Sequence, residues 1–272
     1  MVSVKTPDEI VILREGGRRL AGILQQLIEA AQPGVSTKDL DRLAESLIFS
    51  CGGAPVFRGY RARGARVSYP ASICVSINDE AVHGIPREDR RLREGDAVGI
   101  DIGMRWSIEN QKLIPGSIGD KNQKGGMVTD MAVTIGIGKV SSEAERLMRT
   151  TKEALELGIR SVRPGARIGD ISSAIQRHLQ RAGLGVIREL AGHGVGYELH
   201  EEPLIPNYGK PGTGTILKEG MVIAIEPMAT LGDWRVALQP DEWTFRTADG
   251  SLAAHFEHTV AVTAGGAEVL TK

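Results

Sequence analysis

Hydrophobic side chains recur at helical spacing in two stretches near the start of the chain. Residues 6–9 (TPDE) have the sequence of a capping box with proline at the first helical position, and apolar positions follow on one face: Ile10, Leu13, Leu20, Leu24, Leu27 and Ile28. Pro33 and Gly34 end this pattern. Ser36 or Thr37 can cap a second helix that carries Leu40, Leu43, Leu47 and Ile48. The pattern therefore predicts two consecutive amphipathic helices.

The second half of the chain has the same order of elements. Helical spacing returns over residues 142–161 and 168–182. Short apolar runs follow each helix pair and predict strands at 72–77, 96–103 and 130–136, then at 185–189, 221–226 and 257–264. Helices segregated from strands in each half indicate an α+β fold with a mostly antiparallel sheet.

Four pairs of segments repeat in the same order in both halves. The matched segments are 33–40 with 164–171, 83–86 with 200–203, 92–101 with 217–226, and 130–134 with 257–261. The offsets between partners range only from 117 to 131 residues. Such self-similarity is typical of an internal repeat. We therefore expect one domain, residues 1–272, built from two pseudo-two-fold related halves at approximately 1–138 and 139–272.

The repeat matches acid with acid: Asp101 with Glu226, and Asp130 with Glu257. Each of these residues begins or ends an apolar strand, where a carboxylate is destabilising unless it is paired or bound to a metal. A two-fold relation between the halves would bring the four strand ends together. Four carboxylates that close cannot all stay ionised without a cation. The pattern therefore predicts a site for two divalent ions.

Three histidines extend this prediction. His193 lies between glycines that allow close approach of the backbone, and it is our candidate for a nitrogen ligand. His83 and His200 are matched by the repeat in the pattern H-x-x-P and would flank the carboxylates as a substrate clamp. The other three histidines, His178, His255 and His258, are interpreted as surface or core residues.

Charge and composition exclude several classes of partner. The 33 basic and 34 acidic side chains give a net charge of -1, which provides no electrostatic basis for binding nucleic acid or a membrane surface. No apolar run is long enough to span a bilayer. The first residues lack a secretory signal pattern, and two cysteines, Cys51 and Cys74, cannot form a disulfide framework. We expect a cytoplasmic protein.

Motifs of other enzyme classes are incomplete in this sequence. His200 lacks a second histidine four residues later, so it does not begin a zincin helix. Residues 192–196 (GHGVG) are one residue short of a dinucleotide fingerprint, and the chain contains no phosphate-binding loop of the G-x-x-x-x-G-K-[ST] type. Residues 116–119 (GSIG) do not form a nucleophile elbow.

Taken together, these segments resemble the type I methionine aminopeptidases, which have the pita-bread fold shared with creatinase and prolidase. The resemblance covers essentially the whole chain and is carried by residues 69–78, 83–86, 99–101, 130–134, 192–196, 200–203, 225–227 and 257–259. It implies that two divalent ions are held by Asp101, Asp130, His193, Glu226 and Glu257. Asp130 and Glu257 would bridge the ions.

The resemblance also implies a reaction, the removal of the N-terminal methionine from nascent proteins and peptides, with a preference for a small second residue. A hydroxide activated by the two ions would attack the scissile carbonyl, and Glu226 would accept its proton. His200 would stabilise the oxyanion, while His83 would hydrogen-bond the amide or the leaving amine. These ligands do not select among Co(II), Mn(II), Fe(II) and Zn(II).

By the same resemblance, five side chains would line an apolar pocket for methionine: Tyr60, Tyr69, Cys74, Leu199 and Trp243. Two of them have an equally good structural interpretation. Cys74 can be a small core residue, and Leu199 can belong to a strand.

Two segments depart from the family pattern. Asp101 and Asp130 enclose 28 residues, more than the short hairpin of the family, so we interpret residues 104–129 as an insertion. Extra residues also lie between Tyr60 and Tyr69 (RARGARVS). We favour an extended, solvated hairpin for the insertion, with a contact to the ribosome as the alternative.

Two other functions stay open from the sequence. One is a prolidase-like peptidase, a class that normally carries an additional N-terminal domain. The other is a non-catalytic binding module, although every expected ligand is present. We expect a monomer with no direct nucleic-acid partner.

Overall fold

The computed structural model describes residues 2–61, 66–107 and 126–272. Four long helices form where the hydrophobic pattern predicts them: α1 (Pro7–Ala30), α2 (Thr37–Ser50), α3 (Ser142–Arg160) and α4 (Ile168–Arg181). The capping box of α1 is complete, because the Thr6 hydroxyl accepts the Glu9 N–H and the Glu9 carboxylate accepts the Thr6 N–H. Ser36 and Asp39 make the equivalent box at α2. None of the helices in these ranges is long and apolar enough to cross a membrane.

The main sheet has nine strands, and every recorded pairing within it is antiparallel. Its path runs through β1 (Ala54–Pro55), β4 (Ala97–Trp106), β5 (Met127–Gly136), β14 (Glu257–Thr263), β9 (Val222–Ile225), β7 (Ala191–Gly194) and β8 (Glu201–Pro206). Off this path, β2 (Ile73–Ile77) pairs with β4, and β15 (Gly266–Val269) pairs with β14.

The matched segments of the sequence lie symmetrically in this sheet. The central pair is β5 and β14, which carry Asp130 and Glu257. On either side lie β4, which carries Asp101, and β9, which Glu226 follows directly. Next to these come β2 and β7. These six strands therefore occupy corresponding positions on either side of the boundary between β5 and β14.

Two three-stranded sheets complete the structure. One contains β13 (Ala253–His255), β10 (Met228–Thr230) and β6 (Gly185–Val186), and the other contains β11 (Val236–Leu238), β12 (Phe245–Thr247) and β3 (Glu80–Val82). The strand predicted at 185–189 is thus only two residues long and lies outside the main sheet. The sequence pattern does not predict strands β7 and β8, because glycine and charged residues interrupt their apolar pattern.

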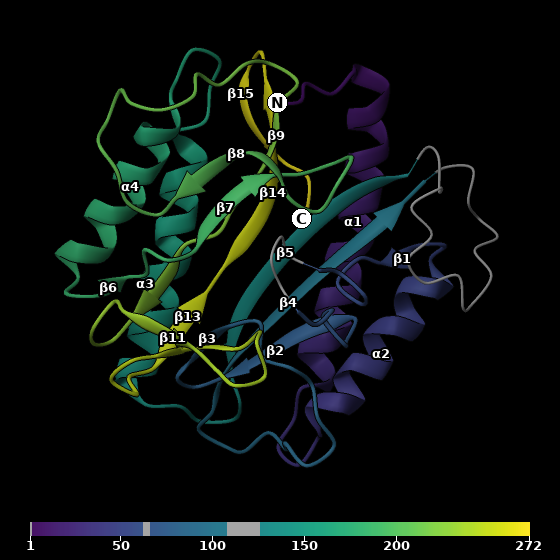
Figure 1. The fold of residues 1–272 in the computed structure, drawn as a ribbon, viewed down its shortest axis with the longest axis vertical. Helices are drawn as coiled ribbons and strands as arrows, with labels where there is room; N and C mark the ends of the chain where they lie inside the picture. The colour runs from purple at the N-terminus through teal and green to yellow at the C-terminus, as the bar shows by residue number, and fades with distance from the viewer. Residues whose placement is uncertain (1, 62–65, 108–125) are drawn as a thin grey trace.

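The helices cover one face of the main sheet. Figure 1 shows α1 and α2 behind β4 and β5, with α3 and α4 behind the other end of the sheet. Two apolar clusters fill these layers, one between α1, α2 and β4, the other between α3, α4 and strands β9 and β14. Because the helices occupy only this face, the opposite face of the central strands is left for other side chains.

Candidate metal centre

The register of the central strands places the predicted acids on the face opposite the helices. Asp101 and Glu257 are both paired with Ala132, one from each side of β5. Residues paired across a sheet share a face, and so do residues two apart along a strand. Asp130 therefore faces the same way as Asp101 and Glu257. The small side chain of Ala132 leaves the space between the acids open.

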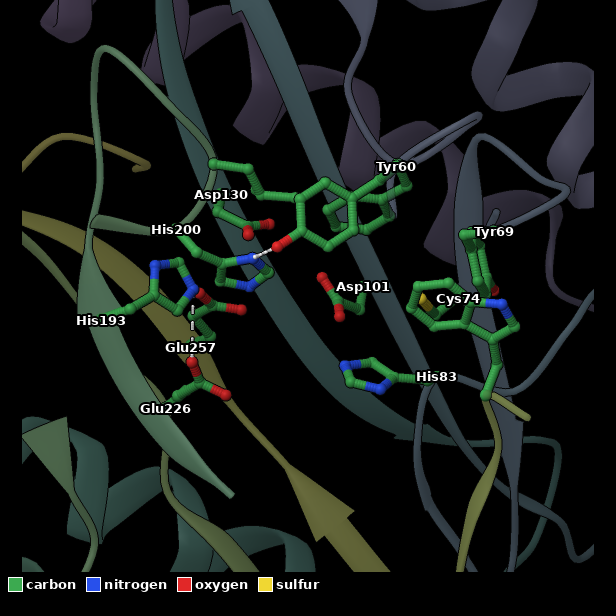
Figure 2. Close-up of a pocket in the computed structure, with 13 residues that line it drawn as sticks. Tyr60, Tyr69, Cys74, His83, Asp101, Asp130, His193, His200, Glu226 and Glu257 are labelled. Atoms are coloured by element: carbon green, nitrogen blue, oxygen red, sulfur yellow. Dashed lines mark hydrogen bonds and ion pairs between the residues drawn. The ribbon is translucent and has the colours of Figure 1, made fainter. Parts of the chain in front are cut away.

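His193 and Glu226 reach the same space from the neighbouring strands. Figure 2 shows the carboxylates of Asp101, Asp130, Glu226 and Glu257 turned toward a common centre that the His193 ring also borders. Nε2 of His193 lies 3.5 Å from Oε1 of Glu226. Donor atoms of Asp130, His193 and Glu257 all lie within 4.8 Å of one another. The structure thus brings together all five residues that the sequence predicts as metal ligands.

The donor set fits a cation, because several of its oxygens have nothing else to bind. Three buried carboxylate oxygens lack a hydrogen-bond partner in the described part of the chain: Asp101 Oδ1, Asp130 Oδ1 and Glu257 Oε1. An unsatisfied buried oxygen is costly, and the cost is larger for a charged group. A divalent ion would satisfy these oxygens and neutralise the charges together.

Burial and mutual repulsion both raise the pKa values of the acids. Burial raises the pKa of Asp101 to about 7. It also raises the pKa values of Asp130, Glu226 and Glu257 well above their usual range, and neighbouring acid charges add to the effect. Without a cation, the centre therefore holds protons that ordinary carboxylates release.

The orientation of His193 suits a nitrogen ligand. Its Nδ1 lies 2.9 Å from the carbonyl oxygen of Gly194, so Nδ1 carries the proton and Nε2 offers a lone pair toward the acids. Burial lowers the pKa of His193 to about 3, which keeps the ring neutral. Gly192 permits the close packing of this strand, because an added Cβ would lie 2.4 Å from the Ala224 carbonyl oxygen.

His83 and His200 stand at the rim of the centre (Figure 2). The His200 ring lies 4.3 Å from the His193 ring, and the Tyr60 hydroxyl is 2.6 Å from Nδ1 of His200. His83 has a φ of 58°, which a non-glycine residue seldom adopts, and its ring packs 6.3 Å from Trp243. Burial lowers the pKa values of both histidines to about 4, so both rings are neutral near pH 7.

A cavity of about 210 Å³ opens beside the five candidate ligands and is bordered by both rim histidines. Its remaining lining is mostly apolar and contains all five predicted pocket residues together with one more: Phe57, Tyr60, Tyr69, Cys74, Leu199 and Trp243. Phe57 was missed because no motif includes it. Leu199 lies in a bend between β7 and β8, so its interpretation as a strand residue is wrong.

The other three histidines lie in different environments. His178 is half-buried beside Glu153, and His258 is bonded to the Thr271 hydroxyl away from the cavity. His255 is buried next to the acids, with Nε2 3.7 Å from Glu226 and 3.8 Å from Glu257. The interpretation of His255 as an ordinary core histidine therefore overlooked its position. Its spacing of two residues from Glu257 in a strand-like segment was the available signal.

The two segments that depart from the family pattern lie largely outside the described residues. Strands β4 and β5 extend into the predicted insertion 104–129, where Trp106 pairs with Met127. Residues 108–125 of this insertion are not described. Residues 62–65, in the segment between Tyr60 and Tyr69, are not described either.

The buried carboxylates and imidazole define a metal-binding protein, and comparisons with known proteins give its family. The sequence profile of metallopeptidase family M24 matches residues 11–109 and 121–264, leaving unmatched a stretch within the predicted insertion. The methionine aminopeptidase of Clostridium acetobutylicum is 44% identical over 271 residues, covering 100% of this chain and 99% of that protein. The chain belongs to metallopeptidase family M24.

Solved structures agree with the pita-bread fold expected from the sequence. The crystal structure of methionine aminopeptidase from Thermotoga maritima matches with a TM-score of 0.89 and 40% identity, over 100% of both chains. The Xaa-Pro dipeptidase from Bacillus anthracis has the same fold, with a TM-score of 0.72 at 21% identity. The match covers 99% of this chain but only 62% of that dipeptidase.

Proposed function

We propose that this chain is a methionine aminopeptidase that hydrolyses the bond after the N-terminal methionine of nascent proteins and peptides. The observation that carries the proposal is the direct contact between the donor set and a small apolar cavity. The relatives and the structure that match end to end are methionine aminopeptidases. Since the chain also belongs to a metallopeptidase family, the activity is metal-dependent.

We propose two divalent ions, held by the five residues that gather at the centre of the sheet: Asp101, Asp130, His193, Glu226 and Glu257. Asp130 and Glu257, on the two central strands, would bridge the ions. Carboxylate and imidazole donors accept Mn(II), Fe(II), Co(II) or Zn(II), so availability would select the metal. When bound, such ions lower the pKa of a coordinated water toward neutrality and polarise a carbonyl oxygen.

Three side chains handle protons and charge during the reaction. Glu226 faces the cavity with its side chain 12% exposed, and its carboxylate accepts the proton of the attacking water. His200 donates a hydrogen bond from Nε2 to the carbonyl oxygen as negative charge develops there. His83, on the opposite side of the cavity, hydrogen-bonds the amide nitrogen and then the leaving amine.

The cavity selects the side chain to be removed. Drug-sized ligands occupy pockets of about 300–1,000 Å³. The cavity of about 210 Å³ is smaller than this and accommodates a single side chain. The Tyr69 hydroxyl donates to the carbonyl oxygens of Ile73 and Gly84, at 3.1 and 3.0 Å, which fixes one wall. An apolar wall with sulfur and aromatic groups suits a thioether. We propose that a small second residue is preferred.

Peptide assays with purified protein test the proposal. Met-Ala, Met-Lys and Xaa-Pro peptides would be incubated with metal-free protein supplied in turn with Mn(II), Fe(II), Co(II) or Zn(II). We expect release of methionine, faster from Met-Ala than from Met-Lys, and none with a chelator. Cleavage of Xaa-Pro bonds alone would establish the prolidase-like alternative, and no cleavage of any peptide would favour a binding module.

The domain organisation, oligomeric state, localisation and partners of the enzyme are also proposals. We propose a single catalytic domain of two related halves, supported by the symmetric strand order. We further propose a cytoplasmic monomer that meets its substrates as nascent chains, without membrane or nucleic-acid partners. A contact of residues 104–129 with the ribosome would be tested by deleting this segment and measuring cosedimentation with ribosomes.

A further inference from the structure

His255 is a buried histidine beside the acids that the proposed reaction leaves without a role. Its side chain is 6% exposed, and Nε2 has no hydrogen-bond partner within the described residues. The same nitrogen lies 3.7 Å from Oε2 of Glu226 and 3.8 Å from Oε2 of Glu257. Buried polar nitrogens in native proteins are nearly always paired, so this one needs an explanation.

Strand pairing fixes His255 next to both acids. The recorded pairs on either side of the centre are Met228 with His255 and Ile225 with His258. Both pairs belong to one continuous register, which places Glu226 opposite Glu257. His255 precedes Glu257 by two residues in an extended segment, so both side chains emerge on the same side.

The backbone of His255 is also held in place. The Thr134 hydroxyl accepts the His255 N–H and donates to the His255 carbonyl oxygen, both at 2.9 Å. Thr134 belongs to β5, the strand that carries Asp130. The position of the imidazole is therefore tied to the same sheet that presents the metal ligands.

We propose that His255 is a positioning residue of the metal centre, which holds the carboxylates of Glu226 and Glu257 through an N–H at Nε2. The inference rests on the proposed metal centre. His255 does not line the cavity and does not belong to the compact donor group of Asp130, His193 and Glu257, which favours positioning over direct ligation. With metal bound, the ionised carboxylates would be stronger acceptors for an N–H at Nε2 than protonated carboxyls are.

Metal titration of metal-free protein tests this role. Calorimetry with Mn(II) would compare the wild type with His255→Leu, which removes the N–H, and His255→Gln, which keeps an N–H donor. The matched control is His258→Leu, a half-buried histidine on the adjoining strand β14 that contacts Thr271 instead. Loss of such a supporting hydrogen bond typically weakens metal affinity by about 10- to 100-fold. We expect this loss of Mn(II) affinity in His255→Leu. His255→Gln and His258→Leu should bind Mn(II) about as tightly as the wild type.

Absorption spectra with Co(II) add a second readout. Under the proposal, His255→Gln leaves the Co(II) spectrum unchanged because no ligand is lost. Wild-type affinity in His255→Leu would overturn the proposal. An equal loss of Mn(II) affinity in His255→Gln, together with a changed Co(II) spectrum, would also overturn the proposal. That result would show that the imidazole itself is a ligand. If His255→Leu does not fold, His255→Met fills the site without an N–H and takes its place.

The same titration separates this inference from the proposed function. A wild-type protein that binds none of the four metals would contradict the metal centre as a whole. A wild type that binds metal, with a His255→Leu variant of equal affinity, would contradict only the role of His255.

Discussion

The Tyr60 hydroxyl lies 2.6 Å from Nδ1 of His200 and links the apolar wall to one of the rim histidines. Burial lowers the pKa of His200 to about 4, so only one ring nitrogen carries a proton near pH 7. Burial also raises the pKa of Tyr60, which keeps its O–H intact. We assign the Tyr60 O–H as the donor to Nδ1, which places the proton of His200 on Nε2, where its proposed role requires a donor.

Tyr60→Phe should therefore slow turnover without releasing metal. Without the hydroxyl, the tautomer of His200 is no longer fixed, and the loss of one hydrogen bond corresponds to about a 10-fold fall in kcat. Kinetics on Met-Ala peptides with parallel metal analysis would measure this. Tyr208→Phe, an exposed tyrosine outside the cavity, is the control. An unchanged kcat in Tyr60→Phe would contradict the assigned tautomer.

His83→Asn should separate catalysis from metal binding. Asparagine tolerates the positive φ of this position, so the backbone is retained while the imidazole is lost. We expect kcat to fall by about 100-fold or more. Metal content, measured by mass spectrometry, should match that of a His178→Asn control, at a half-buried histidine that contacts Glu153. Loss of both ions from His83→Asn would refute its placement on the substrate side.

Asp130→Ala and Glu226→Ala should abolish both metal occupancy and turnover. Each variant removes one carboxylate from a centre in which three buried oxygens have no hydrogen-bond partner among the described residues. Equilibrium dialysis against Mn(II) followed by peptide assay would measure both properties. Glu153→Gln, on the exposed side of α3, provides a carboxylate control. Activity like that of the wild type in either alanine variant would overturn the ligand assignment.

Leu199→Ala should weaken selection of the methionine side chain. Leu199 is 6% exposed and lines the cavity, so truncation enlarges the pocket and removes apolar contact. We expect kcat/KM for a Met-Ala peptide to fall by about 10-fold or more, with a smaller fall for a longer, bulkier first residue. Leu204→Ala, at a position that is 61% exposed, is the matched control. Equal losses for all first residues would argue against a selective pocket.

The metal-free protein should lose stability as pH rises above neutrality. The folded pKa values of Asp130, Glu226 and Glu257 are raised, so the folded state keeps protons that the unfolded chain has released, and stability falls toward those pKa values. The buried site histidines act in the opposite sense, but their lowered pKa values confine that effect to pH below about 6.5.

Thermal unfolding measures this dependence. With chelator present, Tm should decline as pH rises above about 7, whereas excess Mn(II) should suppress the decline because bound metal replaces the protons. Asp130→Asn should make the metal-free decline shallower, while Glu153→Gln should leave it unchanged. A metal-free Tm that rises over this range would refute the raised carboxyl pKa values.

Local patterns were sufficient for the helices and for the main strands of each half. The capping box at Thr6 and the candidate caps Ser36 and Thr37 marked two helix starts to within a residue, because those signals depend only on neighbouring positions. β7 and β8 were not predicted, since their short segments are stabilised by pairing with distant strands and not by their own composition. Phe57 and His255 were missed for a related reason, because neither belongs to a motif.

The sequence by itself singled out the four carboxylates, since the internal repeat matched Asp101 with Glu226 and Asp130 with Glu257. A repeat records which residues correspond, and corresponding residues meet when the halves share one sheet. The tertiary structure added side chains near the donors that no sequence pattern marked, Phe57 and His255. The register that sets Glu226 opposite Glu257, and His255 beside both, arises from hydrogen bonds between segments far apart in the chain. Pairings of this kind leave no periodic trace in the sequence.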